Sequence, residues 1–335
     1  MTSDRNGPWR KTVPPRLLAV LCLAWLTAAC SAPRHGLDAC LTAGCESHRE
    51  AVTLSARYRV RTDAGIAAAR QTADFMEQAA DLWGPLFGDP DPAVLPLEVH
   101  LHQNTADLSA LLARRNLSPL ATGLYLPGPT PTIHTTCCGK EPGHPYRTLL
   151  HEGTHQFVHL VAGCPVPRGY GDNTGVRLAI PLWLNEGLAA YYEGAFVTPD
   201  RLEAGRVAPL RLKQLQQALR RGRAPSVGSL MAKHYGASFA PVDYATAWGI
   251  VYALMQEAPL SVEKITGRQW IQGVVEKSRQ GWGALDSISS NRPARRWWNL
   301  ITERTRADFE AYLAGSGIGL PEWEARWRKW ILSLP

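Results

Sequence analysis

The sequence HEGTH at residues 151–155 constrains the fold and chemistry of this chain more than any other feature. It lies within residues 146–161, where apolar side chains recur at the spacing of an α-helix. Residues i and i+4 of a helix lie one turn apart, so the imidazoles of His151 and His155 point the same way and can bind one metal ion. Glu152 lies beside that pair and can reach a metal-activated water without being a ligand.

A catalytic zinc ion needs a third protein ligand and keeps one position open for water. The segment PLWLNEGLAAYYEG at residues 181–194 is predicted to be a second helix and offers Glu186 as that ligand. Glu193, seven residues later, lies on the same side of that helix and remains a rival. His159 lies about 12 Å along the first helix from His151, too far to share the ion. Small residues in the second helix would let two helices approach closely: Gly187, Ala189 and Ala190.

The two motifs together resemble the gluzincins, a clan of zinc metallopeptidases. The resemblance rests on HExxH at residues 151–155 and on NEGLA at residues 185–189. It implies a zincin-like fold and hydrolysis of peptide bonds, with Glu152 as the general base. It also implies one zinc ion with three protein ligands: His151, His155 and Glu186. The sequence shows no acidic cluster that would bind a free amino terminus, so an endopeptidase or amidase fits at least as well as an aminopeptidase.

Gluzincins also use a tyrosine or histidine to stabilise the oxyanion of the transition state. The resemblance implies Tyr244 for that role, at the start of the helix-like segment 244–254. His234 and Tyr235 remain alternatives, and a packing role for Tyr244 is also open. A predicted strand at residues 131–136 precedes the motif, and we expect it to lie beside the site and pair with an extended substrate.

The first 29 residues are predicted to be a targeting signal rather than part of the fold. Residues 1–16 are polar and basic, and residues 17–29 are apolar but too short to cross a bilayer. Cys30 follows small residues, which resembles a bacterial lipoprotein signal. That resemblance implies a lipid on Cys30 and, because Ser31 follows, an outer-membrane anchor facing the periplasm. Ordinary cleavage nearby, giving a soluble secreted protein, is the alternative.

The remaining chain divides into three predicted parts. Residues 30–50 form a tether, in which Cys40 and Cys45 could close a small disulfide loop in an oxidising compartment. Residues 51–257 form the metallopeptidase domain, and residues 258–335 form a helical subdomain without a motif of its own.

The pattern of apolar residues predicts an α+β fold, with a small N-terminal mixed sheet and a mostly helical C-terminal part. Alternation predicts strands at 51–61 and 97–102 and a strand pair within 122–136, and helical spacing predicts helices at 64–83 and 105–115. Gly84 and Pro85 are expected to end the first of these helices. From residue 146 onward the predicted helices are 146–162, 181–193, 208–221, 243–257, 262–279, 304–314 and 321–333. In the last helix, Trp323, Trp327 and Trp330 form one stripe, which we expect to dock on the core.

The charge of the chain argues against a nucleic-acid partner. The formal net charge is +7, and residues 1–29 contribute +3 of it, which leaves +4 without a dense basic stripe. The expected partners are a peptide or protein substrate and, through the lipid, a membrane; the oligomeric state stays open. A second interpretation is a non-enzymatic envelope binding or assembly lipoprotein that keeps its zinc.

Overall fold

The computed structural model of the chain describes residues 50–115, 117, 121–128, 130–137, 144–165, 176–197, 201–258, 265–281 and 294–335. The expected signal at 1–29, the expected lipid attachment at Cys30 and the expected Cys40–Cys45 loop lie outside these residues. Within the described ranges, no helix has both the length and the apolar character that a membrane span requires.

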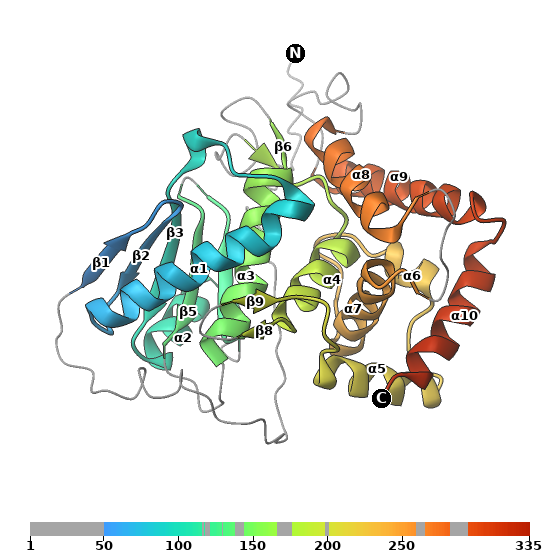
Figure 1. Ribbon diagram of the computed structural model, residues 1–335, viewed down its shortest axis with the longest axis horizontal. Helices are drawn as coiled ribbons and strands as arrows, with labels where there is room; N and C mark the ends of the chain where they lie inside the picture. Colours follow the sequence, from blue (N-terminus) through green and yellow to red (C-terminus); the bar gives the residue numbers. More distant parts are fainter. Residues whose placement is uncertain are drawn as a thin grey trace, which may run out of the picture.

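The N-terminal part is built on a five-stranded mixed sheet with the strand order β1-β2-β3-β5-β4 (Figure 1). Its strands are β1 (Ala51–Leu54), β2 (Tyr58–Thr62), β3 (Leu97–His102), β4 (Gly123–Leu126) and β5 (Thr132–Thr136). The three central strands β2, β3 and β5 run parallel, and the edge strands β1 and β4 run antiparallel to their neighbours. The strand at 97–102 and the strand pair within 122–136 are confirmed.

The single strand predicted at 51–61 is wrong, because the chain turns back on itself between β1 and β2. The backbone N–H of Ser55 donates to the carbonyl of Tyr58 at 2.8 Å, which closes the turn. The backbone N–H of Arg57 donates to Oε1 of Glu77 at 2.6 Å. A glutamate 20 residues away along the chain thus holds a turn that the local alternation does not reveal.

Helices cover both faces of the sheet. The helices α1 (Ile66–Phe87) and α3 (His144–Ala162) share one apolar core with Val99 and Ile133 of the sheet. On the other face, α2 (Thr105–Arg114) packs Leu108 and Leu112 against Leu124 of β4.

The expected end of the first helix at Gly84 and Pro85 is also wrong, since α1 continues to Phe87. A proline inside a helix costs about 3 kcal/mol. The turn that follows it buries Leu86 and Phe87, and each such side chain contributes about 1.5–3 kcal/mol when it is fully buried. The burial therefore outweighs the proline, and the N–H of Gly88 closes the turn on the carbonyl of Gly84 at 2.7 Å.

The C-terminal part is helical, which confirms the α+β class. Its helices are α4 (Leu182–Glu193), α5 (Pro209–Arg220), α6 (Val227–Met231), α7 (Pro241–Met255), α8 (Gly267–Arg279), α9 (Ala294–Ala314) and α10 (Leu320–Ser333). The sequence pattern predicted all of these except the short α6, and it predicted only the second half of α9. Two-residue strands form two small pairs, Cys164–Pro165 with Val176–Arg177 and Phe196–Val197 with Leu202–Glu203.

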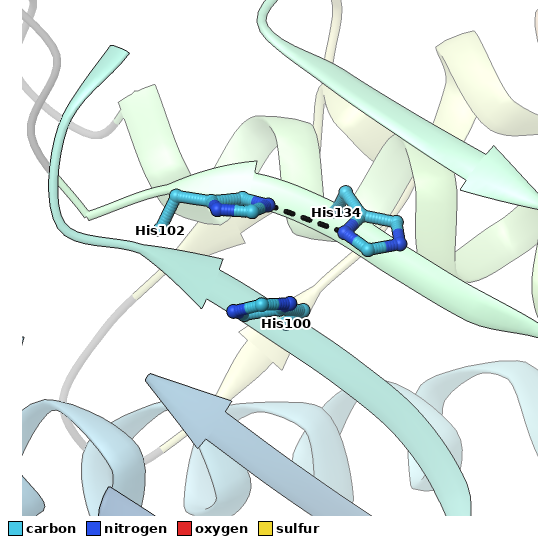
Figure 2. Close-up of side chains that lie close together, drawn as sticks. All are labelled: His100, His102 and His134. Atoms are coloured by element: carbon cyan, nitrogen blue, oxygen red, sulfur yellow. Dashed lines mark hydrogen bonds between the residues drawn. The ribbon is translucent and has the colours of Figure 1, made fainter. Parts of the chain in front are cut away.

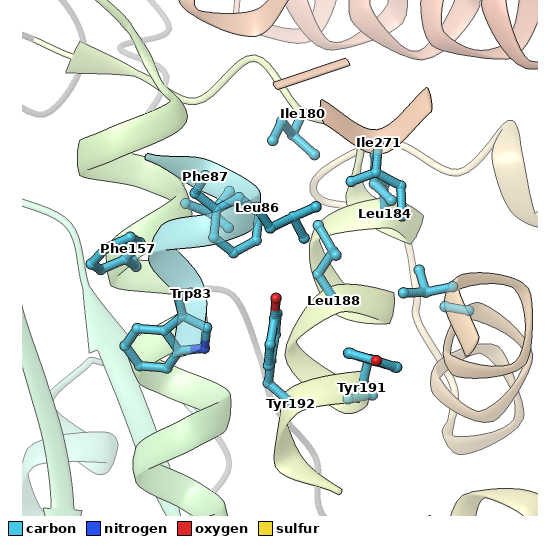
Figure 3. Packing of buried hydrophobic residues seen from close by; sticks show 14 of the residues in the cluster. Trp83, Leu86, Phe87, Phe157, Ile180, Leu184, Leu188, Tyr191, Tyr192 and Ile271 are labelled. Carbon is cyan, nitrogen blue, oxygen red and sulfur yellow. The ribbon is translucent and has the colours of Figure 1, made fainter. Parts of the chain in front are cut away.

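The core joins the sheet layer to the helical part at α4, whose residues from Leu182 to Tyr192 are all buried (Figure 3). Trp83 of α1 lies between α3 and α4, with its ring 5.3 Å from that of Phe157 and 6.4 Å from that of Tyr192. This packing fixes α3 and α4 side by side.

The tryptophan stripe of α10 docks on the core, as expected. Trp323 and Trp327 are buried, and the indole N–H of Trp327 donates to the carbonyl of Gly249 at 3.0 Å. The ring of Trp330 stacks on Tyr252. The stripe therefore holds α10 against α7.

Candidate metal centre

The helices α3 and α4 bring the side chains of His151, His155 and Glu186 together. Oε2 of Glu186 lies 3.6 Å from Nε2 of His151 and 3.4 Å from Nε2 of His155. One ligand atom from each side chain lies within 4.8 Å of the other two. The three side chains are buried, with exposed fractions of 6%, 2% and 0% respectively.

The geometry and the donor set fit a zinc ion. Two ligands that each lie about 2.0–2.1 Å from a tetrahedral ion are about 3.3–3.4 Å apart, close to the separations between Glu186 and the two histidines. Burial alone would raise the pKa of Glu186, but the charge of His155 and hydrogen bonds from both histidines lower it to about 2. Glu186 is therefore an ionised carboxylate, and two imidazoles with one carboxylate form a common zinc ligand set.

Two glycines in the motifs allow the helices to pack this closely. A Cβ at Gly153 would lie 2.5 Å from the ring of Trp83, so the HExxH helix needs glycine where it crosses α1. A Cβ at Gly187 would lie 2.7 Å from both the carbonyl oxygen of Ala247 and Cγ2 of Val251 on α7. The expectation that small residues next to Glu186 permit close helix contact is confirmed at Gly187.

Glu152 is held by the neighbouring edge strand. Its Oε2 accepts a hydrogen bond from the backbone N–H of Tyr125 in β4 at 2.8 Å, and the side chain is 2% exposed. The hydroxyl of Tyr125 lies 2.7 Å from Nδ1 of His159, so His159 interacts with that strand rather than with the cluster. The role of Tyr125 was not predicted, because no local pattern in the sequence links it to Glu152, 27 residues later.

Glu193, the rival ligand, lies outside the cluster of three ligand atoms. Its Oε2 is 3.2 Å from Nδ1 of His151 and 2.8 Å from the guanidinium of Arg211. Partial burial would raise the pKa of Glu193, but Arg211 and His151 outweigh it and hold the pKa below its usual value. An ionised carboxylate only accepts hydrogen bonds, so Nδ1 of His151 donates to Glu193, and Nε2, which faces Glu186, would give up its proton when it binds a metal.

The candidate oxyanion residues belong to α7 and to the segment between α6 and α7. Tyr244 is a buried residue in the first turn of α7, with Phe239 edge-on at 4.8 Å and the guanidinium of Arg211 5.7 Å from its ring centre. The hydroxyl of Tyr235 donates to the carbonyl of Ile180 at 3.3 Å. Burial, and next the charge of Glu186, raises the pKa of Tyr235 well above its ordinary value, so that hydroxyl keeps its proton. His234 is half-buried, with Nδ1 3.1 Å from the carbonyl of Tyr235.

The strand that we expected to pair with a substrate is in the interior of the sheet. β5 has β3 on one side and β4 on the other, so it offers no edge. Within the described residues, β4 is the outer strand on this side of the sheet, and it lies against α3 beside Glu152. The alternation of residues located both strands, but strand order depends on non-local pairing that the pattern does not contain.

Comparison with known proteins gives one match. A family model described as "Protein of unknown function (DUF1570)" matches residues 146–266, roughly a third of the chain. The matched range spans α3, α4 and α7, so it includes both motifs and Tyr244. No curated protein and no solved structure matched the chain.

Proposed function

We propose that this chain is a zinc-dependent hydrolase of peptide or related amide bonds. The observation that carries the proposal is the convergence of His151, His155 and Glu186 from two helices, next to a buried carboxylate, Glu152, whose orientation is fixed by the backbone of Tyr125. The motifs that resemble gluzincins lie inside the matched family range.

The chain supplies the binding and the proton transfer. His151, His155 and Glu186 would hold the ion, and a bound zinc ion supplies Lewis acidity that lowers the pKa of water to about 7 and polarises a carbonyl. Glu152 would accept the proton of the attacking water on its carboxylate. The hydrogen bond from the backbone N–H of Tyr125 holds the carboxylate of Glu152 in one orientation. The candidate base therefore does not lose conformational freedom during the reaction.

The edge strand β4 is the surface on which an extended peptide would bind. An outer strand offers backbone N–H and C=O groups for pairing with an added strand, here those other than the N–H of Tyr125, which already donates to Glu152. The site's carboxylate Glu152 contacts this same strand at Tyr125, so a peptide paired with β4 would run past the candidate base. This replaces the earlier expectation of pairing with the strand at 131–136.

The proposed location is the bacterial cell envelope, through a lipid on Cys30, with a soluble secreted form as the alternative. The basis is the lipoprotein-like segment before Cys30 in the sequence. Radioactive palmitate should label the wild-type chain in bacterial cells and should not label Cys30→Ala. Equal labelling of the two chains would contradict the lipid anchor.

The first experiment measures zinc in the purified full-length chain by mass spectrometry. We expect the ion of this centre to be lost in His155→Ala and in Glu186→Ala. Glu152→Gln should keep it but cleave a quenched fluorescent peptide library about 10²–10⁴-fold more slowly than wild type, because it removes only the general base. Glu310→Gln, which alters an exposed ion pair in α9, is the matched control and should change neither value.

A structural zinc site without catalysis is the second candidate, and the low exposure of the cluster favours it. It predicts a fourth protein ligand and no exchangeable water on the metal. Replacement of zinc by cobalt, followed by titration with azide, separates the two cases. A change in the cobalt spectrum on azide addition indicates an open coordination position on the metal. No spectral change together with no peptide cleavage indicates a structural site. Normal cleavage by Glu152→Gln would contradict Glu152 as the general base, and with it the proposed zinc-hydrolase mechanism.

A further inference from the structure

A second cluster of histidines lies on the opposite face of the sheet. In β3, His100 and His102 alternate with Val99 and Leu101, so both histidines point away from the face that carries the main core. In the parallel pairing of β3 with β5, His134 lies directly beside His100. Figure 2 shows the three rings gathered on these two neighbouring strands.

The three rings are close enough to share one ion. Nε2 of His102 is 3.2 Å from Nδ1 of His134, and the ring of His100 stacks on that of His102 with 4.2 Å between centres. One nitrogen from each ring lies within 4.8 Å of the other two. Ligands at about 2.0–2.1 Å from a tetrahedral zinc ion are about 3.3–3.4 Å apart, so small ring rotations would place all three around one metal. Among the described residues, only this group and the His151 group have this arrangement.

A metal ligand must be a neutral imidazole, and burial disfavours the charged form of these three rings. Burial, followed by the charges of the neighbouring histidines, lowers the pKa of His134 to about 3. Burial and then the charge of His100 lower the pKa of His102 to about 4, and burial lowers that of His100.

The sheet separates this cluster from the first one. Tyr125 and Ile133 are paired across β4 and β5 and face α3, where the HExxH motif lies. The next pair, Leu124 and His134, faces the other way, and Leu124 packs under α2. The two clusters therefore cannot form one dinuclear centre, and each would hold its ion independently.

We propose that His100, His102 and His134 form a second metal site, for a late first-row divalent ion such as Zn²⁺ or Cu²⁺. Three imidazole nitrogens without a carboxylate or a thiolate among them favour these borderline ions over Mg²⁺ and Ca²⁺, which prefer oxygen. Three protein ligands leave a position for water or a further ligand. The site does not depend on the proposed hydrolase activity.

The test counts metal ions per chain. The purified full-length chain is freed of metal with a chelator, dialysed against Zn²⁺ or against Cu²⁺ in separate arms, and analysed by mass spectrometry. Wild type should hold two ions, and His155→Ala and His134→Ala should each hold one. The double variant should hold none. His234→Ala removes a histidine outside both clusters and should still hold two.

Electron paramagnetic resonance of the copper-loaded His155→Ala chain adds a second measurement. Nitrogen coupling is expected there and should be lost when His134→Ala is added. If His134→Ala loses both ions through misfolding, His100→Asn, at a half-buried ring, decides in its place. Two ions in both His134→Ala and His100→Asn would overturn the second site. A single ion in wild type that is lost in His155→Ala would also overturn it. Loss of an ion in His134→Ala but not in His155→Ala would instead overturn the first site and support the second.

Discussion

Oε2 of Glu193 lies 3.2 Å from Nδ1 of His151, while the other ring nitrogen of His151, Nε2, faces Glu186. Arg211 contacts the same carboxylate oxygen at 2.8 Å. A carboxylate in this position fixes the orientation and tautomer of a metal-binding imidazole, and such outer partners commonly contribute 10–100-fold to metal affinity. In the proposed zinc site, Glu193 would therefore orient His151 without being a ligand itself.

The first prediction concerns Glu193→Gln. The amide keeps the shape but loses the charge that holds the proton on Nδ1, so zinc affinity should fall about 10–100-fold while the stoichiometry at saturating zinc stays unchanged. Competition with a fluorescent zinc chelator measures the affinity. Glu203→Gln, which alters a surface ion pair with Arg206, is the matched control. Complete loss of the ion, as expected for Glu186→Ala, would show that Glu193 is itself a ligand.

The second prediction concerns the contact between α4 and α7. Gly187→Ala places a methyl group 2.7 Å from the carbonyl oxygen of Ala247, and backbone cannot move away as a flexible side chain does. We expect a loss of about 1–3 kcal/mol in the free energy of unfolding, typical of an overpacked core. Thermal unfolding followed by circular dichroism should show a lower Tm.

A second glycine provides the control with the opposite sign. A Cβ at Gly273 of α8 would meet nothing within 4 Å. Alanine in an unobstructed helix position is favoured over glycine by about 0.8–1.0 kcal/mol, so Gly273→Ala should raise the Tm. A raised Tm for Gly187→Ala as well would show that α4 and α7 are more loosely packed than the structure indicates.

The sequence could predict the local part of the site and much of the fold. The spacing of His151 and His155 is a property of one helical turn, and the run before Glu186 predicts a helix from its own residues. Both helices are present at the expected positions. The same holds for the strand at 97–102 and for the docking of α10 through Trp327.

The parts that could not be predicted depend on residues far apart in the chain. The β1–β2 turn is held by Glu77, and the orientation of Glu152 depends on Tyr125 in another strand. Alternation places His100 and His102 on one face, but only the pairing of β3 with β5 brings His134 to them. A one-dimensional pattern specifies which side of a strand a residue occupies, and it does not specify which strand lies next to it.

The third prediction separates a chemical role for Tyr244 from a packing role. Arg211 links its ring to the carboxylate of Glu193, so Tyr244 lies in the layer around the cluster. If its hydroxyl stabilises the oxyanion, Tyr244→Phe should lower kcat about 10²–10³-fold with unchanged zinc content and Tm. Tyr235→Phe is measured for comparison, because the hydroxyl of Tyr235 already donates a hydrogen bond to the carbonyl of Ile180. A large loss of kcat in Tyr235→Phe alone would move the role to Tyr235.

The last prediction tests whether β4 positions the candidate base. A Cβ at Gly123 would collide with Cγ2 of Thr148 and lie 3.1 Å from Cγ of Glu152. Gly123→Ala should therefore displace the edge strand from α3 and disturb the Tyr125–Glu152 hydrogen bond. We expect kcat for peptide cleavage to fall at least tenfold, because small errors in the placement of a reacting group are costly. Zinc content should not change, since the ligands lie on α3 and α4.

Rescue by a second substitution shows whether that loss comes from the collision. Thr148→Ser removes the obstructing methyl group and keeps the hydroxyl, which lies 3.3 Å from that of Thr122. The double variant Gly123→Ala with Thr148→Ser should recover part of the lost kcat, while Thr148→Ser alone should resemble wild type. The recovery is expected to be partial, because Cγ of Glu152 still lies near the new methyl group. Full activity in Gly123→Ala itself would show that the candidate base Glu152 does not depend on the position of β4.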